Sequence, residues 1–310
     1  MVARFGNGRA RWIVLTPSAD DEGWRREIAR AGAAAGLKTQ VERAFSEDAG
    51  AGYDDPRRLF ITEDAAIALA ARPSSVVAIM PEPETAPDAV AEAHNTYAPH
   101  SVWHASILLA RAAQLAEEHA VITAKDLARR PTMLRLFGDM EIIPPASIAE
   151  ASRQPAVAAA FAIYRNGDLA DASAIPWSEK LFVYDERASR DWPEWGVMDT
   201  TGRPRMLVWG PYVALPPGVW RAVMRFGVDE AGARRQYRID WGTRTACVSE
   251  YVTPGQSGTY EITLDWLFEE ADAAEMRLIL TEGSFMGTVM FQGMSVQRVP
   301  RTLISSDQAA

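Results

Sequence analysis

The last third of the chain alternates apolar and polar residues over several stretches. One stretch places Trp220, Ala222, Met224, Phe226 and Val228 at every second position. Because successive side chains of a strand point to opposite faces, this period predicts half-buried antiparallel strands. The other apolar positions are Tyr237, Ile239, Trp241, Tyr260, Ile262, Leu264, Trp266, Met276, Leu278 and Leu280, and the polar positions between them are Arg221, Arg225, Arg238, Asp240, Glu261, Thr263, Asp265 and Arg277. Pro- and Gly-rich turns separate the stretches, so we expect a jelly-roll type of antiparallel β-sandwich.

The first part of the chain has a different pattern, in which short apolar runs alternate with helical spacing. We expect strands at 11–16, 38–45, 58–62 and 75–80, and helices at 20–36, 63–71, 101–119, with Ser101 as N-cap, and 121–130. Strands that alternate with helices favour parallel pairing and a Rossmann-like α/β fold.

These patterns divide the chain into two domains and a connector. The expected parts are a Rossmann-like domain at 1–145, an alanine-rich helical connector at 146–190, a β-sandwich at 191–303 and a polar tail at 304–310. The class is therefore α/β plus all-β.

Charge and composition restrict the partners and cofactors that we expect for this chain. The net charge of −9 argues against nucleic acid as a partner, since phosphate contacts need a basic surface. Cys247 is the one cysteine, which leaves no internal disulfide and no cysteine-based zinc site. No apolar run is long enough to span a membrane, and we expect a cytoplasmic protein.

Local motifs for catalysis or cofactor binding are missing from the sequence. Gly6 and Gly8 precede the first expected strand, whereas a dinucleotide loop follows its strand, and Asp20 and Asp21 in the next turn would repel phosphate. There is also no GxSxG or HExxH motif. We expect no cofactor, and the interpretation leans towards binding rather than catalysis.

One cluster of polar residues follows the fourth expected strand. We expect any ligand pocket of the first domain at the carboxyl ends of its strands, with Glu82, Glu84, His100 and His104 as candidate ligand-binding residues. The four-residue spacing of His100 and His104 suits metal ligands on one helical face. However, Ser101 as N-cap would leave His100 outside the helix, so no metal site is predicted.

Aromatic residues are abundant in the sandwich region. Those that fit the alternation are expected in the core. Trp192, Trp195, Trp209 and Tyr251 lie off that register or in loops, and they are the candidate ligand-binding residues of this domain. Exposed aromatic faces can stack on the apolar C–H faces of sugar rings, so these four could form a sugar-binding platform.

The segment from Gly210-Pro211-Tyr212 through Leu215-Pro216-Pro217-Gly218 to Arg221 carries a resemblance. With the alternating strands that follow it and the closing run 291–296, it resembles a carbohydrate-binding-like β-sandwich module that accompanies glycosyltransferases and surface-polysaccharide proteins of α-proteobacteria. The resemblance covers residues 192–300 and implies no catalytic residues. The first domain resembles no family.

The leading hypothesis is a carbohydrate-associated binding or accessory protein of bacterial envelope or exopolysaccharide synthesis. Its expected partners are a carbohydrate or sugar-containing ligand and a protein of polysaccharide synthesis. Two alternatives stay open: a divergent glycosyltransferase-like enzyme with its site at the rim of the α/β sheet, and a protein-interaction scaffold without a small ligand.

Overall fold

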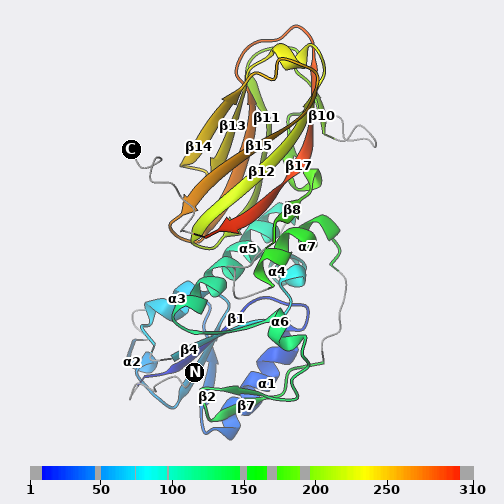
Figure 1. Cartoon of the computed structure of the whole chain (residues 1–310). Helices are drawn as coiled ribbons and strands as arrows, with labels where there is room; N and C mark the ends of the chain where they lie inside the picture. Colours follow the sequence, from blue (N-terminus) through cyan, green and yellow to red (C-terminus); the bar gives the residue numbers. More distant parts are fainter. Residues whose placement is uncertain are drawn as a thin grey trace. The chain divides into compact units, whose positions relative to one another are not determined.

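The computed structural model divides the chain into two compact units, residues 1–168 and 169–310 (Figure 1). It describes residues 9–45, 50–73, 75–95, 98–146, 152–165, 173–188 and 196–300. Trp192, Trp195 and the polar tail predicted at 304–310 lie outside these residues. None of the helices in the described ranges is long and apolar enough to cross a membrane.

Unit 1 contains a five-stranded parallel sheet in the order β2-β3-β1-β4-β5. Its strands are β1 (Arg11–Leu15), β2 (Lys38–Val41), β3 (Arg58–Thr62), β4 (Ser75–Met80) and β5 (Ala120–Thr123). Its helices are α1 (Asp21–Ala34), α2 (Gly50–Tyr53), α3 (Ala65–Ala70), α4 (Ala86–His94), α5 (Ala98–Gln114), α6 (Ala124–Leu127) and α7 (Pro155–Phe161), and β6 (Leu134–Leu136) and β7 (Met140–Ile142) form a hairpin.

The strand order differs from that of the Rossmann fold. The sequence predicted parallel strands, and the sheet is parallel, but β3 rather than β2 lies beside β1. After β1, the chain forms β2 and β3 on one side of β1. It then crosses to the other side of β1, where it forms β4 and β5. This reversal creates a topological switch point between β1 and β4, which is where open parallel sheets bind ligands.

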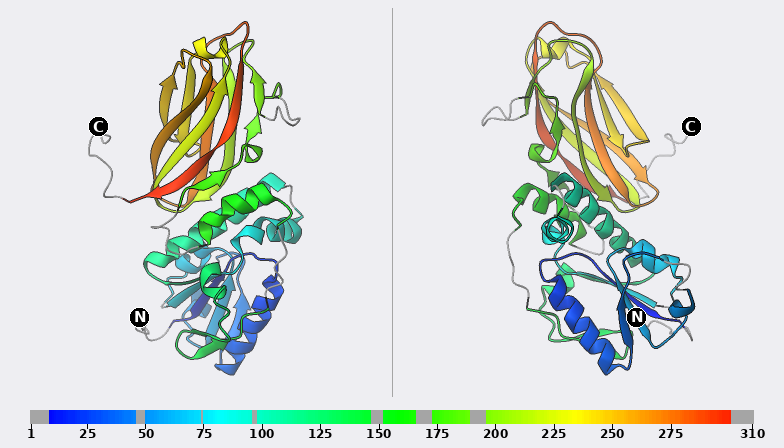
Figure 2. Two further views of the ribbon diagram at one scale, coloured as in Figure 1. Left: turned by 45° about the vertical axis from the view of Figure 1, so that its right-hand side comes forward. Right: turned by 180° about the vertical axis from the view of Figure 1, so that it is seen from behind.

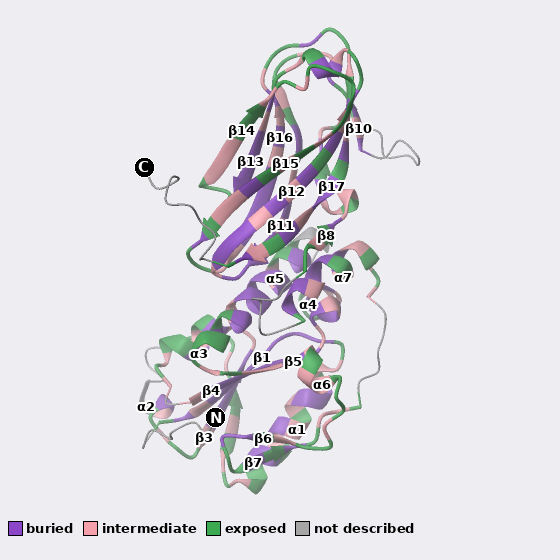
Figure 3. Ribbon diagram, viewed as in Figure 1, coloured by how far each residue is buried: buried purple, intermediate pink, exposed green. Residues whose placement is uncertain are grey.

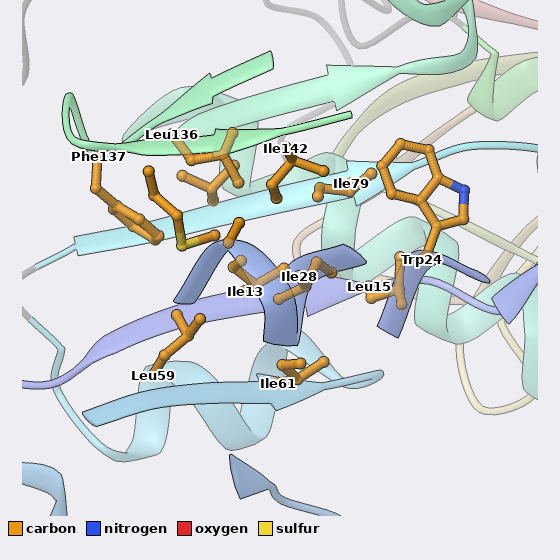
Figure 4. Close-up of a cluster of buried hydrophobic side chains, with 13 residues drawn as sticks. Ile13, Leu15, Trp24, Ile28, Leu59, Ile61, Ile79, Leu136, Phe137 and Ile142 are labelled. Carbon is orange, nitrogen blue, oxygen red and sulfur yellow. The ribbon is translucent and has the colours of Figure 1, made fainter. Parts of the chain in front are cut away.

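Two packed layers cover the sheet of unit 1. Ile13, Ile79 and Leu59 form one cluster with Trp24 and Ile28 of α1, to which Leu136, Phe137 and Ile142 of the β6–β7 hairpin also belong (Figure 4). The connection from β3 to β4 crosses the sheet in the opposite direction to the connection from β1 to β2. By the right-handed crossover rule, α3 therefore lies on the other face, where it contacts α5.

Three expectations for unit 1 need correction. Helix α5 begins at Ala98, so Ser101 lies inside the helix, is fully buried and is not its N-cap. The segment 121–130 is not one helix, because Ala120–Thr123 pairs with β4 and only Ala124–Leu127 is helical. The β6–β7 hairpin was not predicted, since each of its strands has only three residues.

Unit 2 is a β-sandwich, as the alternation predicted. One sheet has the order β10-β17-β12-β15, with β8 also paired to β17, and the other has the order β14-β13-β16-β11-β9. Figure 2 shows the strands of the sandwich from two further sides. The strands are β8 (Ile175–Trp177), β9 (Val183–Tyr184), β10 (Val197–Asp199), β11 (Arg205–Leu215), β12 (Gly218–Val228), β13 (Tyr237–Gly242), β14 (Cys247–Val252), β15 (Gly258–Phe268), β16 (Asp272–Leu280) and β17 (Thr288–Val299).

The predicted apolar positions form the core between the two sheets. Trp220 and Phe226 of β12, and Tyr237 and Trp241 of β13, are fully buried. The indole Nε1 of Trp241 donates to the carbonyl of Trp220 at 3.0 Å, which ties the sheets together. Buried and more exposed positions alternate along β12 from Trp220 to Val228 (Figure 3). Tyr260, Ile262 and Trp266 of β15, predicted as core, are only half-buried, because β15 is an edge strand.

The segment predicted as a helical connector is divided between the two units. Its helix α7 belongs to unit 1. Its later part supplies two short strands to the sandwich, because Ile175–Trp177 pairs with β17 and Val183–Tyr184 pairs with β11. Trp177 is fully buried, and its ring lies 6.1 Å from that of Trp241. The sandwich therefore begins before the expected boundary at 191.

Candidate functional site

Strand register aligns five side chains across the outer face of the β14-β13-β16-β11-β9 sheet. Asp240 lies opposite both Ser249 and Arg277, Arg277 lies opposite Trp209, and Trp209 lies opposite Val183. The residues next to this row, including Ile239, Trp241 and Leu278, are fully buried between the sheets. Because side chains alternate along a strand, the row points away from the core.

Asp240 lies on β13, the second strand of this sheet, and is only 1% exposed. Its Oδ1 accepts hydrogen bonds from Arg238 Nε at 2.6 Å and from Ser249 Oγ at 2.7 Å. Its Oδ2 accepts from Arg238 at 2.9 Å and lies 3.7 Å from Arg277 NH1. The carboxylate therefore lies beneath two guanidinium groups and fixes their positions. The sequence placed Asp240 in water, which is wrong because these longer neighbours cover it.

Glu275 is a second buried carboxylate on the same face and is 5% exposed. It accepts a hydrogen bond from Arg277, and its Oε1 accepts from the hydroxyl of Tyr212 at 3.0 Å. Arg277 also donates to the carbonyl of Arg244 at 3.0 Å. We call Tyr212, Arg238, Asp240, Ser249, Glu275 and Arg277 the sheet-face cluster. Sequence reasoning missed Glu275 and Tyr212, which only strand register and a bulge bring together.

A β-bulge aims Tyr212 at this cluster. The register of β11 against β16 shifts between Pro211 and Ala214, and Tyr212 has a φ of 63°. A tyrosine in the left-handed region is strained, and such strain is concentrated at functional sites. A bulge also re-aims side chains beside binding sites. The sequence signal for this bulge is the Gly210-Pro211-Tyr212 motif, which carried the resemblance.

Hydrogen bonding to the two buried carboxylates favours the charged form of both arginines. The bond to Asp240 raises the pKa of Arg238, and the bond to Glu275 raises the pKa of Arg277. The side chains of Arg238 and Arg277 remain 35% and 19% exposed. The cluster therefore presents oriented cationic donors to solvent, above carboxylates that are already satisfied.

Two of the predicted aromatic residues flank the sheet-face cluster. Trp209 is half-buried opposite Arg277, and Tyr251 is 55% exposed opposite Arg238. Both lie within strands rather than in loops. The structure thus brings Trp209 and Tyr251 to one face, with the guanidinium groups on strands between them.

The second sheet offers a contrast within the same unit. On β12 and β15, Arg221 binds Asp265 through two bonds of 2.8 Å, and Arg225 binds Glu261 at 2.8 Å. These side chains are between 32% and 63% exposed. They are ordinary cross-strand ion pairs, which contribute little to stability or specificity.

Neither a family model nor a curated protein matches the chain. Among solved structures, it is similar to TmCBM61 in complex with β-1,4-galactotriose, with 13% identity and a TM-score of 0.28 over 38% of this chain and 81% of that one. It is also similar to the CBM22-1 xylan-binding domain from Paenibacillus barcinonensis Xyn10C, with 12% identity and a TM-score of 0.26 over 38% and 81% of the two chains. A family 16 carbohydrate-binding module matches at 10% identity and a TM-score of 0.25, over 32% and 73%. Similarities this weak carry no argument about the ligand of this chain.

Unit 1 has a cavity of about 280 Å³ at the switch point of its sheet. It is lined by the loop after β1, the first turn of α1, Glu63 after β3, helix α4, and Ser152 and Arg153. The predicted residues lie outside this lining. Glu82 accepts from Thr85, Glu84 pairs with Arg165 at 2.6 Å, and His100 is exposed.

The structure brings His104 next to His94, which lines the cavity, with ring centroids 5.4 Å apart. Burial lowers the pKa of His104, and His94 lowers it further. Within the described ranges, no three His, Cys, Asp or Glu residues are grouped as a metal site.

We expect the sheet-face cluster to respond to alkaline pH through Tyr212. Burial raises the pKa of Tyr212 to about 12, and Glu275 adds to the shift. The neutral phenol therefore stabilises the fold below the unfolded-state pKa, and this stability is lost as the pH rises from about 10 towards 12. Between pH 10 and 12, the free energy of unfolding measured with urea should fall more steeply with pH for the wild type than for Tyr212→Phe. Equal slopes would contradict the assignment.

Proposed function

We propose that the outer face of the β14-β13-β16-β11-β9 sheet binds carbohydrate. The observation that carries the proposal is the placement of Trp209 and Tyr251 on the face where Asp240 and Glu275 hold two guanidinium groups. A sugar ring has apolar C–H faces and a rim of hydroxyl groups. It therefore needs flat apolar surfaces and oriented polar groups together, and this face supplies both.

The fixed arginines favour this interpretation over a simple ion-pair surface. Asp240 and Glu275 are occupied by arginine, serine and tyrosine donors. The ligand would therefore accept hydrogen bonds from the guanidinium groups, as hydroxyl and ring oxygens do. Because both guanidinium groups are held before the ligand arrives, little side-chain freedom is lost on binding.

A glycan array followed by calorimetry tests the proposal. Trp209→Ala and Tyr251→Ala should each weaken the best glycan by about fivefold to tenfold, because each removes one stacking surface. Phe285→Ala is the matched control, since Phe285 is an aromatic residue of the same unit that is 91% exposed. A blank array together with a stable protein partner would instead favour the interaction scaffold.

The setting that we propose is bacterial envelope or exopolysaccharide synthesis in the cytoplasm, with this chain as a binding or accessory component. The support is the resemblance of the segment from Gly210-Pro211-Tyr212 to Arg221 to modules that accompany surface-polysaccharide proteins. Exopolysaccharide repeat units should then give the strongest array signals. If plant cell-wall glycans gave stronger ones, the setting would be wrong while the binding function stood.

A further inference from the structure

The cavity of unit 1 lies where a parallel sheet accepts a small ligand, but its walls are acidic. Its carboxylates come from Asp21, Glu22, Glu63, Asp88 and Glu92, and its one guanidinium comes from Arg153. The first turn of α1 carries two of these carboxylates, and Asp88 lies in the first turn of α4. These groups would repel a phosphate or carboxylate ligand from both helix N-termini.

A second observation independently indicates a ligand. Ser18 lines the cavity, is only 2% exposed, and its Oγ has no hydrogen-bond partner. The Oδ1 of Asp21, another lining residue, is also out of contact with solvent and unpaired. Buried polar atoms without partners are destabilising, and a bound group is one way in which they are satisfied. Asp21 can only accept, so the missing partner is a donor.

Two of the lining carboxylates already bind a cationic side chain. The guanidinium of Arg25 bridges Asp21 and Glu63, with distances of 2.5 Å and 2.6 Å. Asp88 is occupied differently, because it accepts from Ser152 Oγ at 2.9 Å and from the backbone of Arg153 at 3.1 Å. In the described part of the chain, Glu22 and Glu92 have no ion-pair partner and remain available.

We propose that this cavity binds a small aliphatic amine, with its ammonium group or groups held by Glu22, Glu92 and the free oxygens of Asp21 and Ser18. A bare divalent metal is a poor fit, because no three ligating groups among the described residues meet around one point. An ammonium group has three N–H donors that point in different directions. It can therefore bind carboxylates that lie farther apart than the ligands of one metal ion. This site is separate from the sheet-face cluster and does not depend on the carbohydrate proposal.

Three four-carbon probes of matched length test the proposal on the full chain: putrescine, 1,4-butanediol and succinate. We expect putrescine to raise the melting temperature and to give a calorimetric isotherm, while the neutral diol and the dianion give neither. Added salt should weaken putrescine binding, because the attraction is between charges. Equal binding of the diol, or no binding of putrescine, would overturn the proposal.

Charge-removing variants locate the site. Glu22→Gln and Glu92→Gln should each weaken putrescine by about tenfold, since each removes one carboxylate from the rim. Both side chains are exposed and unpaired within the described ranges, so the variants should fold. Glu250→Gln on β14 makes the same charge change in unit 2 and should leave the affinity unchanged. If all three variants bound putrescine equally, the amine would be bound elsewhere and the assignment would be wrong.

Discussion

Replacing Asp240 with alanine should lower the free energy of unfolding of the sandwich by about 3 kcal/mol, since breaking a buried ion pair leaves uncompensated charge. Asp240 is 1% exposed and supports Arg238 and Arg277 together. Without it, Arg238 and Ser249 lose their hydrogen-bond acceptor, and Arg277 loses one of its two ion-pair partners. Urea unfolding followed by tryptophan fluorescence measures the change.

The Arg221–Asp265 pair provides a matched control for this prediction. It also joins a guanidinium to a carboxylate through two bonds, but its side chains are 41% and 32% exposed. Asp265→Ala should therefore lower the free energy of unfolding by less than about 1 kcal/mol. If the two variants were destabilised equally, burial of Asp240 would not distinguish the two pairs. The Asp240→Ala protein should also bind glycans more weakly, because Arg238 is no longer fixed.

The sandwich could be predicted because period-two alternation repeats over long strands. Trp220, Phe226, Trp241 and Leu278 were expected to be buried, and they are. The short elements could not be predicted. Each strand of the β6–β7 hairpin spans three residues, and the register that defines β5 comes from Val77 and Ala78 of β4, far away in sequence. Periodicity says nothing about such pairings.

The candidate site was predicted only in its aromatic part. Trp209 and Tyr251 stood out because they broke the core register, and both lie on the outer face. The polar part was missed because Asp240 looks like any solvent-facing strand residue. Its burial depends on Arg238 beside it and on Arg277 from a different strand. In unit 1, the position of the cavity follows from the sheet, but its lining residues depend on which turns of α1 and α4 face the switch point.

The true start of the sandwich leads to the second large effect, at Trp177. The sequence assigned this residue to a helical connector, whereas it lies in β8, pairs with Met294 of β17 and is fully buried against Trp241. Trp177→Ala should lower the free energy of unfolding by about 4 kcal/mol, because it leaves a large cavity beside the central tryptophan. A shift of this size would be clear in calorimetric or urea unfolding of the full chain.

Two further variants separate packing from other effects of the tryptophan. Trp103→Ala removes an indole that is 47% exposed and should change the free energy of unfolding by less than about 0.5 kcal/mol. Trp177→Phe keeps an aromatic ring on Trp241 and removes an indole N–H that has no partner among the described residues. Trp177→Phe should therefore lower the free energy of unfolding much less than Trp177→Ala does, since the removal of an unsatisfied donor offsets the lost packing. If Trp177→Ala were as mild as Trp103→Ala, residues 175–177 would not belong to the sandwich core, and the domain would begin near the boundary that the sequence predicted.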